Sequence, residues 1–121
     1  MQTDINALLH FISRCRLCTT DEKMAQSELE NQLIEFGAEF SREHRLSNAD
    51  IVDFTFPMDG GILALEIKLK APKRAIYRQL CRYAEHDTVK AVVLMSGTPM
   101  NLPNEILGKP TALISLGGAW L

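Results

Sequence analysis

The chain has 121 residues, with 46% hydrophobic and 23% charged side chains and a formal net charge of −2. This length predicts one domain with its own core, and the composition is typical of a soluble globular protein. No apolar run approaches the roughly 20 residues of a transmembrane helix and no signal-peptide pattern opens the chain, so we expect no membrane contact.

The first third of the chain predicts two helices. Thr19-x-x-Glu22 is a capping-box pattern, which marks the start of a helix running to about Phe36 with Gly37 as its stop. A shorter amphipathic helix precedes it. Its apolar residues recur at helical spacing: Ile5, Leu8, Leu9 and Ile12.

The three cysteines indicate a cellular compartment and do not indicate a metal site. Cys15, Cys18 and Cys81 are an odd number, which argues against a disulfide framework and for a reducing cytoplasm. The Cys15-x-x-Cys18 pair lacks the further ligands that a zinc or iron–sulfur site requires. We therefore interpret all three as structural or incidental, and expect a cytoplasmic protein.

The middle of the chain predicts three strands. Residues 39–46 have the mixed polarity of a half-exposed strand, and residues 51–57 and 62–70 alternate in polarity around Asp59-Gly60. An Asp-Gly pair between such runs is a strong hairpin signal, because both residues tolerate the positive φ of a type I′ turn. We therefore expect the last two strands to form a hairpin.

The turn also predicts the register of that hairpin. Centring it on Asp59-Gly60 sets Phe56 opposite Leu63 and Asp53 opposite Glu66. Alternation then gives one apolar and one polar face. The apolar face carries Phe54, Phe56, Leu63, Leu65, Ile67 and Leu69. The other face carries Asp53, Thr55, Ala64, Glu66, Lys68 and Lys70.

The remaining elements complete an α/β pattern. Pro72 suits the first position of a third helix, which reaches about His86. The apolar, β-branched run at residues 91–95 predicts a strand buried on both faces and paired in parallel across that helix. Residues 98–110 predict a connection with one helical turn near 104–107, and residues 112–116 a last strand.

This element order predicts a mixed β-sheet of about five strands flanked by helices. We expect a single domain over residues 1–121, because no linker, repeat or low-complexity tract interrupts it. Within it, residues 1–18 would hold the N-terminal helix, 19–97 the core, and 98–121 the C-terminal loop and strand.

Two opposed carboxylates are the most informative feature of the hairpin. Asp53 directly across from Glu66 is destabilising in a plain sheet, whereas a bound divalent cation would turn the repulsion into a binding site. Lys68, two residues on and on the same face, would point at the same spot. The alternative is an ordinary solvent-facing strand on which Lys68 simply neutralises both acids.

The net charge hides a gradient along the chain. Residues 1–60 carry five Lys/Arg against eleven Asp/Glu, whereas residues 61–121 carry eight against four. Arg74, Arg78 and Arg82 recur at four-residue spacing and would form one basic stripe on the third helix, suited to phosphates. A solvated basic helix face is the alternative interpretation.

A second pair on the same helix lies beside this stripe. Gln79 and Tyr83 are four residues apart, so an amide and a phenol fall on one side. Together they suit holding a nucleotide or its phosphate near the acids. The alternative is a surface Gln and a half-buried Tyr that cover the sheet.

In chain order, an acid-bearing helix, Asp53, Glu66-x-Lys68 and Gln79-x-x-x-Tyr83 fall on the predicted elements. This order resembles the PD-(D/E)xK nucleases, the restriction-endonuclease-like superfamily. It is most similar to small stand-alone phage, virus-type and repair nucleases and to Holliday-junction resolvases. Each motif is short, but their order is far more specific than any one alone.

The resemblance spans about residues 27–97, and Val52 stands where the family pattern has Pro. It implies a restriction-endonuclease-like sheet and Mg²⁺-dependent hydrolysis of phosphodiester bonds, with Mn²⁺ able to substitute. Asp53 and Glu66 would hold one or two ions, helped by the Ile67 carbonyl. Lys68 would orient the nucleophile or stabilise developing negative charge.

The resemblance also implies a carboxylate from the preceding helix. Glu30 matches the resolvase pattern, in which apolar residues follow the helix acid at three, four and six positions: Leu33, Ile34 and Phe36. Glu28 is the alternative, although it suits a solvated face better. We expect Glu30 to complete the catalytic and metal-binding set.

The expected function is therefore a DNA endonuclease in phage, recombination or repair processes, acting as a homodimer and without a nucleotide cofactor. Arg74, Arg78, Arg82, Gln79 and Tyr83 would contact the substrate. The alternative is a catalytically silent nuclease-like module that binds nucleic acid or a protein, and a weaker one is a structural protein whose acids are merely salt-bridged.

Overall fold

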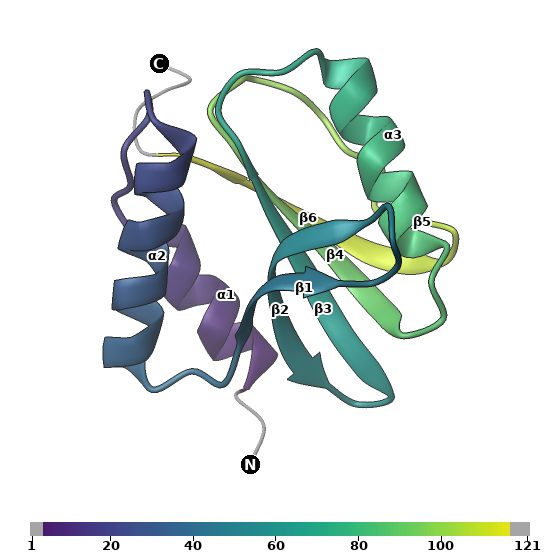
Figure 1. Ribbon diagram of the computed structural model, residues 1–121, viewed down its shortest axis with the longest axis horizontal. Helices are drawn as coiled ribbons and strands as arrows, with labels where there is room; N and C mark the ends of the chain where they lie inside the picture. Colours follow the sequence, from purple (N-terminus) through teal and green to yellow (C-terminus); the bar gives the residue numbers. More distant parts are fainter. Residues whose placement is uncertain (1–3, 117–121) are drawn as a thin grey trace.

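A computed structural model describes residues 4–116 of the chain (Figure 1). Within them, three helices flank one six-stranded mixed sheet of order β1-β2-β3-β4-β6-β5. The helices are α1 (Ile5–Ser13), α2 (Glu22–Phe36) and α3 (Lys73–Ala84). The strands are β1 (Ser41–Arg45), β2 (Ile51–Met58), β3 (Gly61–Lys68), β4 (Val89–Ser96), β5 (Glu105–Ile106) and β6 (Lys109–Ser115).

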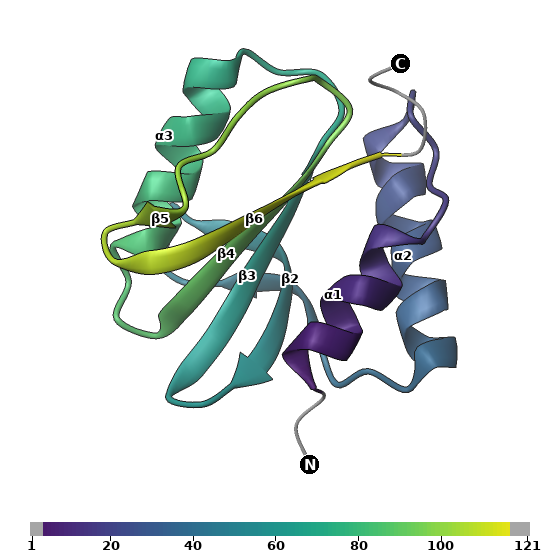
Figure 2. The same cartoon turned by 180° about the vertical axis from the view of Figure 1, so that it is seen from behind.

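The sheet divides two hydrophobic cores. α1 and α2 cover one face and α3 the other, as Figures 1 and 2 show from opposite sides. All six residues of the predicted apolar face of the hairpin lie in the core beneath α1 and α2. Ala64 on the opposite face belongs to the second core, together with Ile76 and Leu80 of α3. Both faces of β3 are therefore buried, and the face that carries Glu66 lies beneath α3.

Local signals in the sequence account for most element ends. Gly37 ends α2 with a left-handed φ of 84°, and Gly60 closes the β2–β3 turn with a φ of 81°. The antiparallel register pairs Met58 with Gly61 and Phe56 with Leu63, so the predicted hairpin register is confirmed. β4 pairs in parallel with β3, as predicted from its apolar run.

Three expectations about the elements are wrong. The sheet has six strands, one more than predicted, because β5 and β6 pair antiparallel around Leu107 and Gly108 where a helical turn was expected. Asp21, not Thr19, caps α2, and its carboxylate accepts the Met24 N–H at 3.0 Å. Pro72 is the N-cap of α3 and not its first residue.

No helix in residues 4–116 has both the length and the apolar character needed to cross a membrane.

Candidate active site

The acid pair lies where the β2–β3 ladder gives way to side-chain hydrogen bonds. The Cα register runs as far as Phe54 opposite Leu65. Beyond it, the Asp53 N–H donates to Glu66 Oε1 at 3.2 Å, and the Ile67 N–H donates to Asp53 Oδ2 at 2.9 Å. Each carboxylate therefore accepts a hydrogen bond from the backbone of the opposite strand, and the two acids face each other as the register predicts.

A cation and a phenol converge on Glu66. Lys68 Nζ lies 3.4 Å from Glu66 Oε2. The fully buried Tyr83 hydroxyl is within donor distance of Glu66 Oε1 at 3.2 Å and of the Ile51 carbonyl at 2.9 Å. Helix α3 thus reaches the catalytic candidates through one aromatic side chain. Burial, followed by the negative charge of Glu66, raises the pKa of Tyr83, so its hydroxyl stays a neutral donor.

Gln79 extends this contact towards the surface of α3. Its Nε2 donates to the Tyr83 hydroxyl at 2.8 Å. Gln79 and Tyr83, which four-residue spacing placed side by side, are therefore joined to Glu66 in one chain of hydrogen bonds.

Burial makes this site costly for negative charge. Glu66 is only 3% exposed. Its pKa is raised to about 7, mainly by burial and then by the charge of Asp53, against the opposing influence of Lys68. Burial also raises the pKa of Asp53, although the Ile67 N–H and Lys68 act the other way. Arg42 also acts on Asp53, yet the pKa of each carboxyl remains raised, so the pair is short of compensating positive charge.

A third carboxyl, missed by the sequence pattern, belongs to Glu22 in the first turn of α2. Burial raises the pKa of Glu22; the charge of Lys68 lowers it and that of Asp53 raises it. Glu22 is therefore in electrostatic reach of both residues. The sequence pattern of Thr19-x-x-Glu22 predicts only a capping role for this residue, at the start of the helix that precedes Asp53.

The two glutamates favoured by the sequence have other partners. Glu30 Oε1 accepts a hydrogen bond from Arg42 Nη1 at 3.0 Å, and the Arg42 guanidinium lies 4.8 Å from the centre of the Phe54 ring. Glu28 accepts the Cys18 N–H at 2.6 Å. The structure thus places Glu30 in a contact between α2 and β1, whereas Glu22 is the α2 carboxyl on which the charges of Lys68 and Asp53 act.

The basic residues of α3 lie on its exposed side. Arg74, Arg78 and Arg82 are all exposed, as the stripe predicts. Arg78 and Arg82 line a hollow together with Gln79, whereas Arg74 lies one turn earlier. Gln79 connects this basic surface to Tyr83 and so to Glu66.

The donor set is suited to a hard cation with few protein ligands. Within residues 4–116, no group of three or more His, Cys, Asp or Glu side chains is placed to hold a metal ion. Mg²⁺ commonly keeps several waters and takes only one or two carboxylates together with substrate phosphates. In the described part of the chain, Asp53 Oδ1 accepts no hydrogen bond, so an oxygen remains for such an ion.

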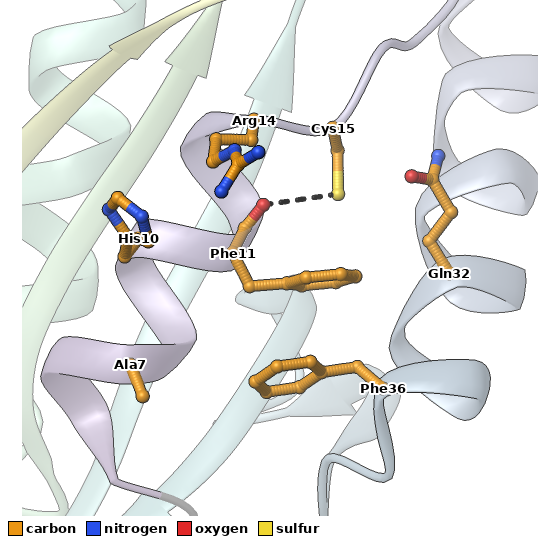
Figure 3. Close-up of a pocket in the computed structure, with 7 residues that line it drawn as sticks. All are labelled: Ala7, His10, Phe11, Arg14, Cys15, Gln32 and Phe36. Atoms are coloured by element: carbon orange, nitrogen blue, oxygen red, sulfur yellow. Dashed lines mark hydrogen bonds between the residues drawn. The ribbon is translucent and has the colours of Figure 1, made fainter.

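One hollow lies away from this chemistry. It occupies about 560 Å³ between α1 and α2, where Phe11 and Phe36 stack with ring centres 4.2 Å apart (Figure 3). No Asp or Glu lines it, and its other residues include Arg14, Cys15 and Gln32. We therefore place the candidate site at the acid pair, because chemistry requires charged groups more than it requires volume.

Comparison of the chain with protein-family models, with curated proteins and with solved structures finds no significant match. The geometry of the site is therefore the basis for any functional assignment.

Proposed function

We propose that this protein is a divalent-metal-dependent nuclease that hydrolyses phosphodiester bonds in DNA. The observation that carries the proposal is the Asp53–Glu66 pair, in which Glu66 is buried and Asp53 half-buried, with Lys68 Nζ 3.4 Å from Glu66 Oε2 as a close counter-charge. An excess of buried carboxylates is favourable when a cation compensates it. The resemblance to PD-(D/E)xK nucleases supports the same chemistry.

Each residue has a role that follows from its position. Asp53 and Glu66 would hold Mg²⁺ or Mn²⁺, and Glu22 would add negative charge from α2. When bound, the ion would neutralise charge on the phosphate and acidify a water. Lys68 would hold that water or stabilise the charge that develops on the phosphate oxygens. Tyr83 fixes the orientation of Glu66.

Cleavage assays with a lysine variant test the proposal. We expect the protein to cut supercoiled, branched or single-stranded DNA in Mg²⁺ or Mn²⁺, and Lys68→Ala to lower the rate by roughly a hundredfold or more. Lys70→Ala is the matched control, because Lys70 is exposed and lies just beyond β3. Equal rates for wild type and Lys68→Ala would remove Lys68 from the mechanism.

A silent nucleic-acid-binding module is the second candidate function. It is favoured by the backbone N–H groups that both carboxylates accept, because these hydrogen bonds stabilise the acids whether or not an ion binds. Thermal unfolding separates the two proposals, since an ion that binds the folded state raises the melting temperature by mass action. A rise with millimolar Mn²⁺ that Asp53→Asn abolishes favours the nuclease; DNA binding with no rise favours the silent module.

We further propose that two copies act together on duplex DNA. A chain of 121 residues offers little surface to grip a duplex, whereas a dimer would present one site to each strand. Light scattering with and without DNA measures the assembly state. A complex that contains only one protein chain per duplex would eliminate the dimer.

A further inference from the structure

We propose that a hollow on the exposed side of α3 binds a second phosphate group of the nucleic acid, next to the phosphate at the acid pair. The hollow has a volume of about 430 Å³ and is lined by Ala75, Arg78, Gln79 and Arg82. The inference rests on the proposed function for its ligand, and adds a separate phosphate site to it.

The hollow offers two guanidinium groups, and the chain segment that carries them brings no acid of its own; the carboxylate in contact with them is that of Asp50, on Arg82. Between residues 67 and 84 there is no Asp or Glu. Within the described part of the chain, Arg78 bonds only the Arg74 carbonyl, through Nε, and the Nη groups of Arg82 have no partner. Guanidinium N–H groups form paired hydrogen bonds to phosphate oxygens, which a lysine cannot reproduce.

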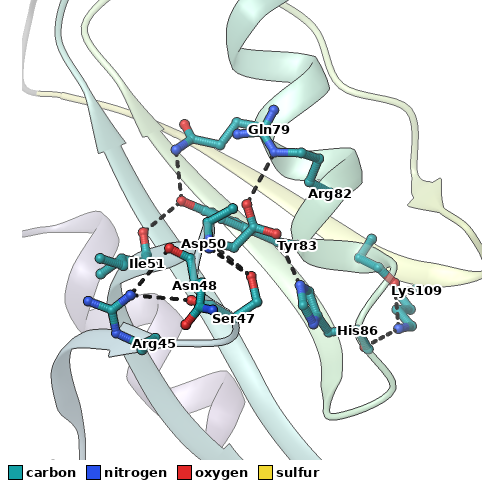
Figure 4. A network of polar contacts seen from close by, with 12 residues as sticks. Arg45, Ser47, Asn48, Asp50, Ile51, Gln79, Arg82, Tyr83, His86 and Lys109 are labelled. Carbon is teal, nitrogen blue, oxygen red and sulfur yellow. Dashed lines mark hydrogen bonds and ion pairs between the residues drawn. The ribbon is translucent and has the colours of Figure 1, made fainter.

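A buried carboxylate orients one of these guanidinium groups. Arg82 Nε contacts Asp50 Oδ1 at 3.1 Å, and His86 Nε2 lies 3.0 Å from Asp50 Oδ2 (Figure 4). Asp50 is 7% exposed, and its own N–H donates to Ser47 Oγ at 3.1 Å. The hydrogen bond from His86, with a smaller contribution from Arg82, holds the pKa of Asp50 below its usual value.

Asp50 therefore acts as a positioning residue. It engages the Nε edge of Arg82 and leaves the Nη groups for a ligand. A guanidinium that is already held in place loses less conformational entropy when it binds. The contact also joins the C-terminal half of α3 to the turn before β2.

A short chain of hydrogen bonds connects the hollow to the acid pair. Gln79 lines the hollow and donates to Tyr83, which in turn contacts Glu66. A strand with one phosphate at Glu66 would thus bring a neighbouring phosphate to Arg78 and Arg82. That phosphate is either an internal phosphodiester or a terminal phosphate monoester.

Binding of short single-stranded DNA in EDTA, followed by fluorescence anisotropy over a range of salt concentrations, tests the site. Two probes are used, identical except for a 5′-hydroxyl or a 5′-phosphate. Arg78→Gln and Arg82→Gln should each weaken binding roughly three- to tenfold and reduce the slope of log K against log salt by about 0.7. Lys90→Gln is the control. This substitution also removes one positive charge, but Lys90 lies beside Gly60 at the hairpin turn and does not line the hollow.

The two probes identify the source of the phosphate. Equal losses with both indicate an internal phosphodiester, and a loss confined to the 5′-phosphate probe indicates a terminal monoester; either result supports the site. Unchanged affinity and salt slope in both arginine variants would overturn it.

Asp50→Asn separates an oriented arginine from bulk electrostatics. Loss of an acid should tighten DNA binding if net charge alone decides, whereas loss of Arg82 orientation should weaken it about threefold. Arg82→Lys keeps the positive charge but loses the paired N–H groups of the guanidinium, so it too should weaken binding. If circular dichroism shows that Asp50→Asn is unfolded, Arg82→Lys becomes the test of the positioning role. Tighter binding by Asp50→Asn, or wild-type binding by Arg82→Lys, would overturn the positioning role.

The phosphate site and the nuclease can each be overturned without overturning the other. Arginine-dependent binding by a protein that cuts no DNA in Mg²⁺ would support the phosphate site and remove the nuclease. DNA cleavage together with arginine-independent binding would retain the nuclease and overturn the phosphate site.

Discussion

At the scale of single residues, Glu66 brings together the energetic cost and the proposed chemistry of the site. Its carboxyl is buried beside a second acid, and it accepts hydrogen bonds from the Asp53 N–H and the Tyr83 hydroxyl. Those bonds fix its orientation, but burial still raises its pKa to about 7. In the absence of a cation, ionisation of Glu66 near neutral pH therefore works against the folded state.

This cost predicts a characteristic pH dependence of stability without metal. The pKa of Glu66 is raised in the folded state, so its stabilising contribution is complete below about pH 4.5 and is lost as the pH rises through about 7. Glu66→Gln removes this loss and should gain on the order of 3 kcal/mol relative to wild type between pH 4.5 and 8. Urea unfolding in EDTA at several pH values measures the difference.

The exposed Glu35→Gln is the control, because it also removes one carboxylate but lies away from the acid pair on the surface of α2. Saturating Mn²⁺ should remove the advantage of Glu66→Gln at pH 8, since the ion stabilises only the carboxylate form. A difference between Glu66→Gln and wild type that stays constant from pH 4.5 to 8 would contradict a raised pKa for Glu66.

At the scale of elements, the residues of the site lie near the ends of a helix and two strands, where the periodic pattern of buried and exposed residues gives little information. Glu22 lies in the first turn of α2, Asp53 near the start of β2, and Glu66 and Lys68 at the end of β3. The apolar pattern of α2 identifies the side of the helix that packs on the sheet, and Glu30 was chosen from its position beside that pattern. The first turn of a helix, where Glu22 lies, is too short to show such a periodic signal.

We expect Glu22 and not Glu30 to matter for catalysis. Glu22→Gln should lower the cleavage rate about tenfold or more, because it removes negative charge that acts on Asp53 and Lys68. Glu30→Gln should leave the rate within roughly threefold and cost at most about 1 kcal/mol of stability through the partly exposed Arg42 ion pair. The opposite ranking in the cleavage assay would restore Glu30 as the helix acid.

The hairpin was predictable and the β5–β6 turn was not, for one physical reason. Asp59-Gly60 suits the positive φ of a tight turn, and it fixed the register that brings Asp53 to Glu66. Leu107 also adopts a positive φ, 53°, but a leucine in the sequence does not predict such a conformation. β5 has only two residues, too few to show alternation.

At the scale of the whole molecule, the sequence predicted the layers better than the polar network of α3. Strand alternation and apolar runs identified the two buried faces, because burial leaves a periodic signal. Asp50 is more than thirty residues from both Arg82 and His86, and nothing in the local pattern of any of the three indicates the contact. Long-range polar partners of this kind depend on the packed fold.

The same fold places charge in a consistent arrangement around the sheet. The acid pair lies where β2 begins and β3 ends, and the Tyr83 hydroxyl of α3 contacts Glu66 there. Helices α2 and α3 lie on opposite faces of the sheet (Figure 1). The arginines of α3 are exposed on the side that would meet a polyanion. A cation between the acids would complete this arrangement and lower the cost of burying them.

The central claim is that Asp53 and Glu66 together hold a divalent cation. Its most direct test is an anomalous difference map from crystals soaked in MnCl₂ near pH 7.5, with Asp53→Asn crystals treated in the same way. We predict a manganese peak in contact with Asp53 Oδ1 and the Glu66 carboxylate in the wild type, and its loss in the variant. A wild-type map with no manganese at these two carboxylates would contradict the account.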